Sequence, residues 1–271
     1  MTEQMNGNLD GPAAKGGRTP FADQRQQAIV SHLRAAGRVD VGEMATELGV
    51  TNETVRKDLI LLERQGLLRR VHGGALPVGH LSFEPAVSER TYFTEEKRRI
   101  AQAALAHLPT EGAVLIDAGS TTSLLAEMFP VGQELAVFTN TLTIAMTLLK
   151  HPGLTVSTFG GRIRTLTVAE VGDWAARALA DINVDVAFLG ANGISVERGM
   201  TTPDPDEAAI KRLMVGSARR RIVLADHSKI GNISLCKHAD LDDIDLLITD
   251  TGVADAQLRA LRRAGLEVEL A

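Results

Sequence analysis

Residues that could bind an anion follow an apolar run of strand length, Ala113–Asp117. Directly after it come Ala118-Gly119-Ser120-Thr121-Thr122 and then a helical pattern. Free backbone N–H groups at the start of a helix attract phosphate, and ligands of open α/β sheets bind at the carboxyl ends of strands. The segment is therefore a candidate phosphate site. A structural helix that simply begins with a Ser or Thr cap explains the same residues.

Similar polar residues follow other apolar runs of the chain. They are Thr139-Asn140, Gly160-Gly161-Arg162, Gly190-Ala191-Asn192-Gly193 and Asp226-His227-Ser228-Lys229. Because the carboxyl ends of parallel strands meet at one edge of a sheet, we expect these segments to converge on one ligand. Lys229 or Arg162 would neutralise a phosphate there. Glu207 and Lys211, four residues apart, either join the site or form an ordinary surface pair.

A second group of chemically capable residues lies near the N-terminus, on two short predicted helices joined by Gly49-Val50-Thr51. Asp40 and Thr51 can cap these helices, and Val55, Leu59 and Leu62 repeat at the spacing of a buried stripe. Two short helices joined by such a turn are typical of a helix-turn-helix, whose second helix enters the DNA major groove. The remaining exposed side chains are the candidate DNA contacts, unless they form only a solvated face: Thr51, Asn52, Glu53, Thr54, Arg56 and Lys57.

A short β-hairpin is predicted directly after these helices, over residues 67–75. Its glycines, Gly73 and Gly74, permit a tight turn. Arg69, Arg70 and His72 of this hairpin could reach the DNA backbone or the minor groove. Together with the second helix, the hairpin extends the candidate DNA-binding surface.

Composition limits the other possibilities. The net charge is -5, and residues 1–77 carry ten Lys or Arg against nine Asp or Glu, so any DNA contact must be local. The single cysteine, Cys236, excludes an internal disulfide framework and a cysteine-rich zinc site. No apolar stretch is long enough to span a membrane, and no signal peptide is recognisable. We therefore expect a cytoplasmic, nucleoid-associated protein.

The elements that must position these residues indicate two domains. From about residue 95, apolar strands alternate with helical patterns, which favours an α/β fold with a mostly parallel sheet covered on both faces. We predict a disordered tail over residues 1–20, a winged helix-turn-helix domain over 21–77, a linker over 78–94 and an effector-sensing α/β domain over 95–271.

The N-terminal motif is similar to that of a known family. Val50-Thr51-Asn52-Glu53-Thr54-Val55-Arg56-Lys57-Asp58-Leu59, followed by Arg69-Arg70-Val71-His72-Gly73-Gly74-Ala75, resembles the winged helix-turn-helix signature of the DeoR family of bacterial repressors. The family usually has arginine where Lys57 stands. Because lysine cannot form the bidentate fork, Lys57 is expected to contact phosphate rather than a base.

The C-terminal segments also resemble the sensor domain of this family, which is similar in fold to ribose-5-phosphate isomerase and the coenzyme A transferases. The resemblance implies a repressor of sugar-metabolism genes that binds operator DNA as a homodimer or homotetramer, needs no cofactor or metal and is released by a phosphorylated sugar. Phe83-Glu84-Pro85 and Asp185–Thr202 resemble actinobacterial members associated with fructose or phosphotransferase-system sugars, so a fructose phosphate is one candidate. The implied effector-binding residues are Asp117, Gly119, Ser120, Thr121, Thr122, Thr139, Asn140, Gly161, Arg162, Asn192, Gly193, Glu207, Lys211, Asp226, Ser228 and Lys229.

The alternative is an isomerase or acyl-transfer enzyme fused to a DNA-binding segment. Isomerisation needs a carboxylate base, and the isomerase carries an acidic run where this chain has Gly190-Ala191-Asn192. Amides do not abstract protons. Only Glu207 or Asp226 could substitute, so we expect a binding protein with no catalytic residues.

Overall fold

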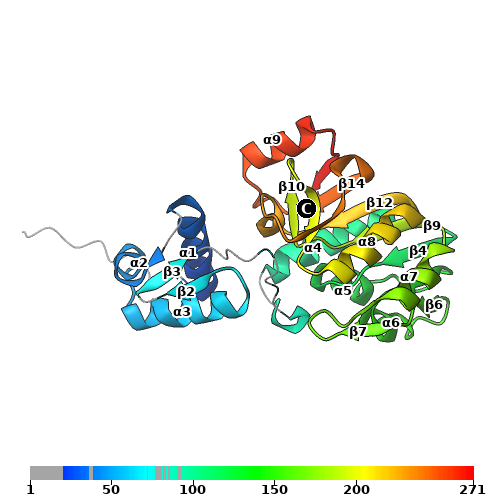
Figure 1. Ribbon diagram of the computed structural model, residues 1–271, viewed down its shortest axis with the longest axis horizontal. Helices are drawn as coiled ribbons and strands as arrows, with labels where there is room; N and C mark the ends of the chain where they lie inside the picture. Colours follow the sequence, from blue (N-terminus) through cyan, green and yellow to red (C-terminus); the bar gives the residue numbers. More distant parts are fainter. Residues whose placement is uncertain are drawn as a thin grey trace, which may run out of the picture. The chain divides into compact units, whose positions relative to one another are not determined.

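The computed structural model describes residues 21–36, 39–71, 73–76, 81, 84, 86–90 and 93–271. Contacts divide the chain into two compact units (Figure 1): one runs to Glu63 and resumes over Leu67–Pro77, and the other comprises Val78–Ala271 with Arg64–Gly66. The predicted tail, His72 of the predicted hairpin, and Phe83 and Pro85 lie outside the described residues.

The smaller unit has the helix-turn-helix and hairpin that the sequence predicts. Asp40 caps the second helix by accepting from the amides of Gly42 and Glu43, and Gly49 ends it in the left-handed conformation. The hydroxyl of Thr51 accepts from the amide of Thr54 at the start of the third helix. The elements are α1 (Ala22–Ala36), β1 (Val39–Asp40), α2 (Val41–Leu48), α3 (Asn52–Arg64), β2 (Arg69–Val71) and β3 (Gly74–Leu76), with the strands in the order β1-β3-β2.

A buried carboxylate holds α3 against α1. Asp58 is 3% exposed and accepts from Arg25 Nε at 2.6 Å and from Gln26 Nε2 at 2.9 Å. On the same side of α3, Val55, Leu59 and Leu62 are buried. These contacts fix which face of α3 is left for solvent.

The larger unit is built on a seven-stranded sheet in the order β15-β14-β12-β9-β4-β5-β6, and all its strand pairs are parallel. Its strands are β4 (Ala113–Ile116), β5 (Ala136–Thr139), β6 (Thr155–Thr158), β9 (Val184–Leu189), β12 (Ala218–Leu224), β14 (Leu246–Thr249) and β15 (Val268–Leu270). The helices are α4 (Thr94–Ala104), α5 (Ser120–Glu127), α6 (Leu142–Leu148), α7 (Asp173–Ala180), α8 (Pro205–Ser217) and α9 (Asp255–Arg263).

Helices cover both faces of this sheet, which confirms the predicted α/β architecture. Alternate strand residues enter two cores: Val114 and Phe188 belong to the core that also contains buried residues of α4, α5 and α6. Leu115 and Leu189 belong to the core with residues of α7, α8 and α9. Burial on both faces explains why the strands read as continuous apolar runs.

Several elements were not predicted. Helix α4, a hairpin of β7 (Arg162–Arg164) and β8 (Ala169–Val171), and the edge strand β15 lack the long apolar runs on which strand prediction depends. The same holds for a second small sheet, in the order β10-β11-β13. Its strands are β10 (Gly193–Ser195), β11 (Gly199–Thr202) and β13 (Cys236–Ala239).

The strand order places a crevice at the centre of the large sheet. From β4 the chain adds β5 and β6 on one side, whereas β9, β12, β14 and β15 extend the sheet on the other side. At such a switch point the connections after the two central strands diverge and leave room for a ligand at their carboxyl ends. The segments after β4 and β9 are the predicted Ala118–Thr122 and Gly190–Gly193.

Candidate functional site

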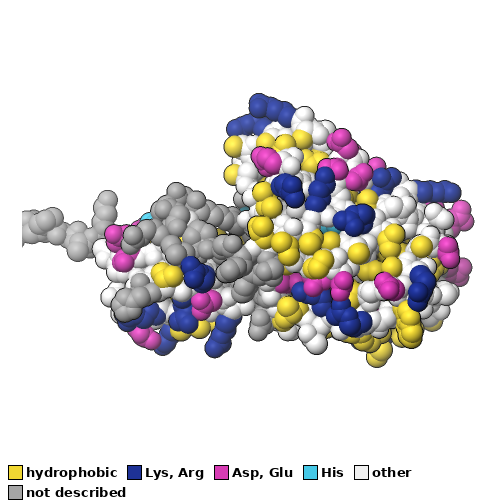
Figure 2. All heavy atoms as spheres, viewed as in Figure 1, with side chains coloured by type: hydrophobic (Ala, Val, Ile, Leu, Met, Phe, Trp, Pro, Cys, Tyr) yellow, Lys and Arg dark blue, Asp and Glu magenta, His cyan; other side chains and the backbone are white. Residues whose placement is uncertain are grey.

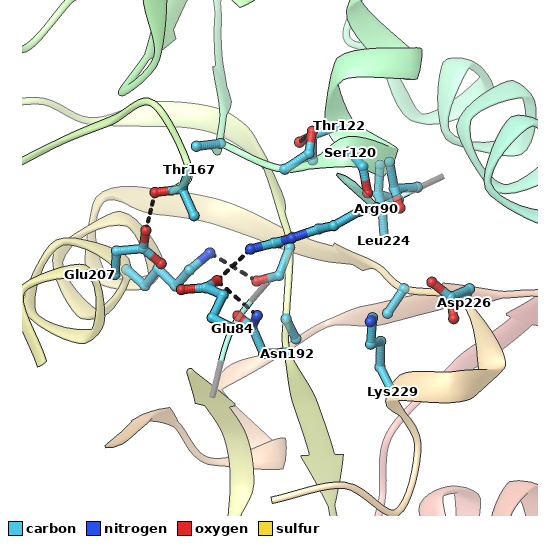
Figure 3. A pocket seen from close by; sticks show the side chains of 17 residues that line it. Glu84, Arg90, Ser120, Thr122, Thr167, Asn192, Glu207, Leu224, Asp226 and Lys229 are labelled. Atoms are coloured by element: carbon cyan, nitrogen blue, oxygen red, sulfur yellow. Dashed lines mark hydrogen bonds and ion pairs between the residues drawn. The ribbon is translucent and has the colours of Figure 1, made fainter. Parts of the chain in front are cut away.

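A pocket lies at this switch point (Figure 3), with an empty volume of about 470 Å³ that includes the part open to solvent. It is lined by Glu84, Arg90, Ala118, Gly119, Ser120, Thr121, Thr122, Thr167, Gly190, Ala191, Asn192, Glu207, Lys211, Leu224, Ala225, Asp226 and Lys229. The lining is largely polar and carries both charge signs. It is therefore suited to a ligand that combines an anion with hydrogen-bonding groups.

One part of the pocket can hold an anion. Gly119 is the N-cap residue of α5 and supplies no side-chain hydrogen bond to the amides of the first turn. The first residues of this helix, Ser120–Thr122, line the pocket, and a helix carries partial positive charge at its N-terminus. Among the residues that the structure describes, the ammonium group of Lys229 has no hydrogen-bond or ion-pair partner, and its side chain is part of the pocket wall.

A buried lysine of α4 adds positive charge near Lys229. Lys97 is 5% exposed, and its Nζ donates to the carbonyl oxygen of Arg90 at 2.9 Å. Burial lowers the pKa of Lys97 to about 8; the charge of Asp226 opposes this shift, and the charges of Lys229 and Arg90 reinforce it. An anion in the pocket would relieve the repulsion among these cations.

The floor of the pocket is held by Asp117, which is fully buried. Its Oδ2 atom accepts from the amide of Gly190 at 2.9 Å and from Lys211 Nζ, which also donates to the carbonyl oxygen of Gly190 at 3.1 Å. Its Oδ1 atom is buried and has no hydrogen-bond partner among the described residues. A buried acceptor without a donor is costly, so a ligand hydroxyl that reached it would be favoured.

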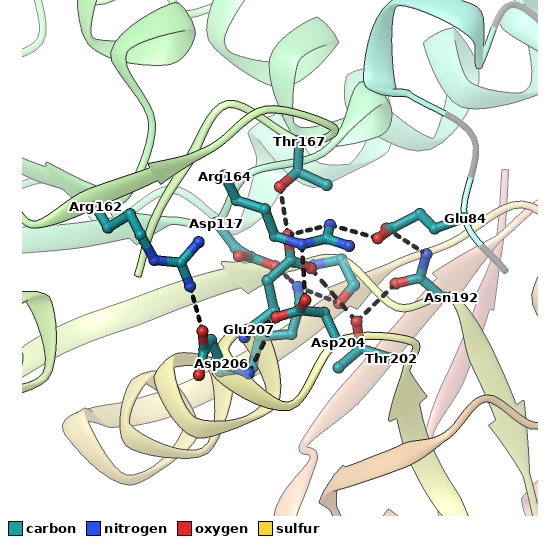
Figure 4. A network of polar contacts seen from close by, with 12 residues as sticks. Glu84, Asp117, Arg162, Arg164, Thr167, Asn192, Thr202, Asp204, Asp206 and Glu207 are labelled. Carbon is teal, nitrogen blue, oxygen red and sulfur yellow. Dashed lines mark hydrogen bonds and ion pairs between the residues drawn. The ribbon is translucent and has the colours of Figure 1, made fainter. Parts of the chain in front are cut away.

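Carboxylates and arginines form a network on another wall (Figure 4). Glu84 accepts from Arg90 Nη2 at 2.5 Å, from Arg164 Nη1 at 2.5 Å and from Asn192 Nδ2 at 3.0 Å. Arg164 also pairs with Asp204 at 2.9 Å. Figure 3 shows the Arg90 side chain crossing the pocket toward Glu84. Glu84, which lies in the predicted linker, is thus a fixed part of the pocket wall.

Glu207 is the second carboxylate of this network. It accepts from Thr167 Oγ1 and, at 3.1 Å, from Arg164 Nη1. Burial, together with the nearby charge of Glu84, raises the pKa of Glu207 above its ordinary value, although Lys211, Thr167 and Arg164 oppose the shift. Its hydrogen bonds fix the Glu207 carboxyl group within the wall.

The smaller unit presents a separate candidate surface. On α3, Glu53, Arg56 and Lys57 are exposed opposite the buried stripe, and Arg56 Nη1 lies 3.7 Å from Glu53 Oε2. Thr51 and Thr54 share a hydrogen bond of 2.9 Å between their hydroxyls. The outward face is therefore available for the groove and phosphate contacts expected of a recognition helix.

The arginines of the hairpin are positioned differently. Arg69 is exposed, whereas Arg70 Nε donates to Glu63 Oε2 at 2.6 Å and the Arg70 amide donates to Glu63 Oε1 at 2.7 Å. The hydrogen bond from the Arg70 side chain is the main reason that the pKa of Glu63 is lowered. Arg70 thus ties β2 to α3, and a DNA phosphate would compete with Glu63 for it.

Both units match one protein family. Residues 25–78 match the DeoR-like helix-turn-helix domain, and residues 93–251 match the DeoR C-terminal sensor domain. The chain belongs to the DeoR family. This agrees with the resemblance seen in its sequence motifs.

Curated relatives with the DeoR arrangement match along almost their whole length. The chain is 35% identical to the putative aga operon transcriptional repressor of Escherichia coli O157:H7 over 97% of this chain and 98% of that protein. It is 37% identical to the HTH-type transcriptional regulator GlpR of Haloferax volcanii, over 90% and 96% of the two chains. The HTH-type transcriptional repressor GlcR of Bacillus subtilis is 32% identical, over 92% and 96%.

Among solved structures, ribose 5-phosphate isomerase A from Neisseria gonorrhoeae matches 51% of this chain and 54% of its own, with 17% identity and a TM-score of 0.37. A match this weak carries no argument about activity. The named relatives of this DeoR-family chain are transcriptional regulators and repressors, which agrees with the expectation that it is not an enzyme.

The pocket brings together many of the effector-binding residues predicted for this DeoR-family chain. Those in its lining are Gly119, Ser120, Thr121, Thr122, Asn192, Glu207, Lys211, Asp226 and Lys229. Glu207 and Lys211 are each 5% exposed, so they are not the surface pair that their spacing also allowed.

A second set of the predicted effector-binding residues lies outside the pocket lining and helps to position it. Asn140 Oδ1 accepts from the amide of Ala118 at 2.8 Å, and Asp117 Oδ2 accepts from the amide of Gly190. Thr139 Oγ1 accepts from the amide of Thr141, and Ser228 Oγ donates to Asp226. A Cβ atom on Gly193 would lie 2.5 Å from the carbonyl oxygen of Asn232, so only glycine allows this close approach.

Gly161 and Arg162 lie outside the lining. Arg162 is on β7, mostly exposed, and pairs with Asp206 on α8. Its position after an apolar run therefore did not bring it to the pocket, because the chain turns away into the β7–β8 hairpin. Of the two cations proposed to neutralise a phosphate, Lys229 lies in the pocket wall and Arg162 does not.

Sequence reasoning missed Glu84, Arg90, Lys97 and Thr167. No local pattern marks them; the place of Glu84 is set by contacts with residues distant in sequence, such as Arg164 and Asn192.

The described residues also contain no cluster of three His, Cys, Asp or Glu side chains suited to a metal ion. None of the described helices combines the length and apolar character needed to cross a membrane.

Proposed function

We propose that this protein is a sequence-specific repressor of sugar-metabolism genes that leaves its operator when a phosphorylated sugar binds the pocket. The observation that carries the proposal is that one wall combines an uncapped α5 N-terminus with the ammonium group of Lys229, which has no partner among the described residues. Backbone N–H groups and a cation together favour a phosphate. A neutral sugar would leave the ammonium group unpaired.

The rest of the pocket suits the hydroxyl groups of a sugar. Asp117 lies next to the lining residues Gly190 and Lys211, and its Oδ1 atom has no donor among the described residues. Asn192 and Glu207 of the lining offer further polar atoms. A phosphorylated sugar fulfils both requirements at once, whereas inorganic phosphate fulfils only one. A fructose phosphate is one candidate effector.

Binding must also change the affinity for DNA. An anion in the pocket competes with Glu84 for Arg90, and Glu84 belongs to the segment that precedes α4. A ligand that binds better when the Arg90–Glu84 ion pair is broken therefore favours a different arrangement of the segment that contains Glu84. By linkage, operator DNA must weaken effector binding by the same factor; a typical coupling of about 1–3 kcal/mol corresponds to roughly 5- to 150-fold. As a regulator of chromosomal genes, the protein would act in the cytoplasm, at the nucleoid.

A labelled-operator complex provides the test. We expect a sugar phosphate to release the operator, the corresponding unphosphorylated sugar to leave it bound, and the Thr121→Val, Lys229→Ala double variant to respond much more weakly. Lys237→Ala is the matched control, because that lysine is partly exposed, pairs with Asp240 and is not part of the pocket lining. The control should respond like the parent protein.

Two results would contradict the proposal. Release by the unphosphorylated sugar would show that the phosphate is not the recognised group. An undiminished response in the double variant would show that the ligand binds elsewhere. Turnover of the sugar phosphate by the purified protein would instead favour the enzyme hypothesis.

A further inference from the structure

Helix α6 exposes an apolar stripe on its outer side. Leu142, Met146 and Leu149 are 41%, 65% and 62% exposed, and their spacing puts them on one helix face. The opposite face, with Ile144 and Leu148, is fully buried in the core of the larger unit. The helix is therefore apolar on two sides, whereas a helix that faces water normally has a polar outer face.

The strand next to α6 in sequence is an unprotected sheet edge. Strand β6 is last in the strand order and pairs only with β5 among the described strands. Its sequence, Thr155-Val156-Ser157-Thr158, contains no charge and no proline, and its register with β5 shows no bulge. Proteins usually protect such edges with lysines, prolines or bulges, because open backbone groups pair readily with another chain.

The stripe and the edge form one neutral region. From Leu135 to Gly161 the sequence has no acidic residue, and Lys150 is its only Lys or Arg. Figure 2 shows apolar side chains along the part of the larger unit where Figure 1 labels α6 and β7. Ile163 of β7, 44% exposed, adds to this apolar area. We refer to Leu142, Met146, Leu149, Ile163 and strand β6 as the α6–β6 surface.

We infer that the α6–β6 surface is where a second copy of this chain docks. In a two-fold assembly each patch meets itself, and over residues 135–161 only Lys150 would bring like charges together. The exposed Arg162 beside Ile163 is already paired with Asp206. Two β6 edges can pair antiparallel about the two-fold axis, with the apolar stripes of the two α6 helices flanking the new strand pair. The larger units would then share one continuous sheet.

The apolar stripe of α6 is only part of the area that an interface needs. A stable interface takes about 800 Å² from each partner, so β6 and Ile163 must contribute alongside the three exposed side chains of α6. The DNA-binding unit also requires a second copy, because one recognition helix reads too few bases to define an operator. This argument rests on DNA binding by the helix-turn-helix, not on the proposed effector.

The oligomeric state of the full chain tests the inference. We expect sedimentation to give at least twice the 29.0 kDa chain mass. Met146→Asp should weaken the association roughly 100-fold or more, because it buries an unpaired charge in the interface. Thr155→Lys should act independently by placing like charges across the paired edges. Both residues are exposed in one copy, so neither change enters the core.

Val196→Asp is the matched control. Val196 is 45% exposed and lies between β10 and β11, in the other sheet of the larger unit. It should keep the parent mass and the parent's thermal unfolding. The Met146→Asp and Thr155→Lys variants should each unfold cooperatively like the parent protein at a concentration where the parent has dissociated. A parent chain that stays monomeric at all concentrations, with and without operator DNA, would overturn the inference. So would Met146→Asp and Thr155→Lys variants with the same mass as the control, which would leave the surface for another kind of partner.

Discussion

Replacing Lys97 by methionine should stabilise the protein while weakening its binding of anions. The ammonium group of Lys97 is 5% exposed, and burial lowers its pKa from 10.5 to about 8. Since one pKa unit corresponds to about 1.4 kcal/mol, the charged form costs the native state about 3 kcal/mol at neutral pH. Methionine fills similar space without that charge.

The net gain is smaller than this cost. The substitution also removes the hydrogen bond from Lys97 Nζ to the carbonyl oxygen of Arg90, which contributes about 1 kcal/mol. We therefore expect the free energy of unfolding at pH 7 to rise by about 2 kcal/mol. For a unit of this size the melting temperature should increase by roughly 4–8 °C.

The pH dependence distinguishes this cause from improved packing. Below pH 8, Lys97 is protonated in both the folded and unfolded states, so the folded state bears the whole cost. Between pH 8 and 10.5 the folded state releases its proton while the unfolded state keeps it, so the stability of the parent protein rises with pH. The advantage of Lys97→Met should therefore shrink over this range.

Thermal or urea unfolding of Lys97→Met, the parent and the exposed-site control Lys237→Met provides the comparison. The control should change stability little at any pH, because exposed ion pairs contribute little. Inorganic phosphate should bind Lys97→Met more weakly than the parent, since a positive charge near Lys229 is lost. A variant with no gain at pH 7, or with a gain that stays constant to pH 10.5, would refute the reasoning.

Other substitutions separate the functions of the two units. Arg56→Ala should weaken operator binding by about 1–3 kcal/mol and relax base preference, as measured by competition between operator variants; unchanged preference would show that Arg56 does not read a base. Gly74→Ala should disrupt the β1–β3 pairing, because the added Cβ would lie 1.9 Å from the carbonyl oxygen of Val39. Operator binding should then be lost, whereas phosphate binding to the larger unit should persist. Glu84→Gln should tighten phosphate binding by about 1 kcal/mol in calorimetry, since a competing carboxylate for Arg90 is removed, and weaker binding would contradict this. Burial lowers the pKa of His238 well below its usual value, so below pH 6.5 the unfolded chain takes up a proton that the native protein does not. The parent protein therefore loses stability as the pH falls. His238→Leu should reduce this loss by about 1.4 kcal/mol per pH unit, measured from urea midpoints at pH 5 and 7.

The fold of the smaller unit and the central strands could be predicted because their signals are local. Asp40, Gly49 and Thr51 mark helix ends through short-range hydrogen bonds and a left-handed turn, and the sequence shows each of them directly. The central strands are buried on both faces, so they read as apolar runs. Helix α4 was missed because its charged outer positions hide a short buried stripe that includes Ile100 and Ala104.

The site was predicted only where it coincides with strand ends. Gly119–Thr122 and Asn192 follow central strands, so topology alone brings them to the switch point. Glu84 and Arg90 come from a segment with no periodic pattern, and their positions depend on ion pairs with distant residues such as Arg164. Arg162 shows the converse: it follows an apolar run, but β6 is the outermost strand, so its end lies away from the centre of the sheet.

Because the pocket lies at a topological switch point, the residues that form the sheet are largely different from the residues that line the pocket. The hydrogen bonds of the sheet are made within the strands. Several residues that line the pocket come after the strand ends, such as Ser120 at the start of α5 and Ala191 after β9. Exchanges at these positions can alter ligand preference at little cost in folding, whereas changes at Asp117 or Gly193 would disturb the framework. A pocket built in this way can change its ligand through a handful of substitutions, so engineering a sensor for a new metabolite should begin with Ser120 and Ala191.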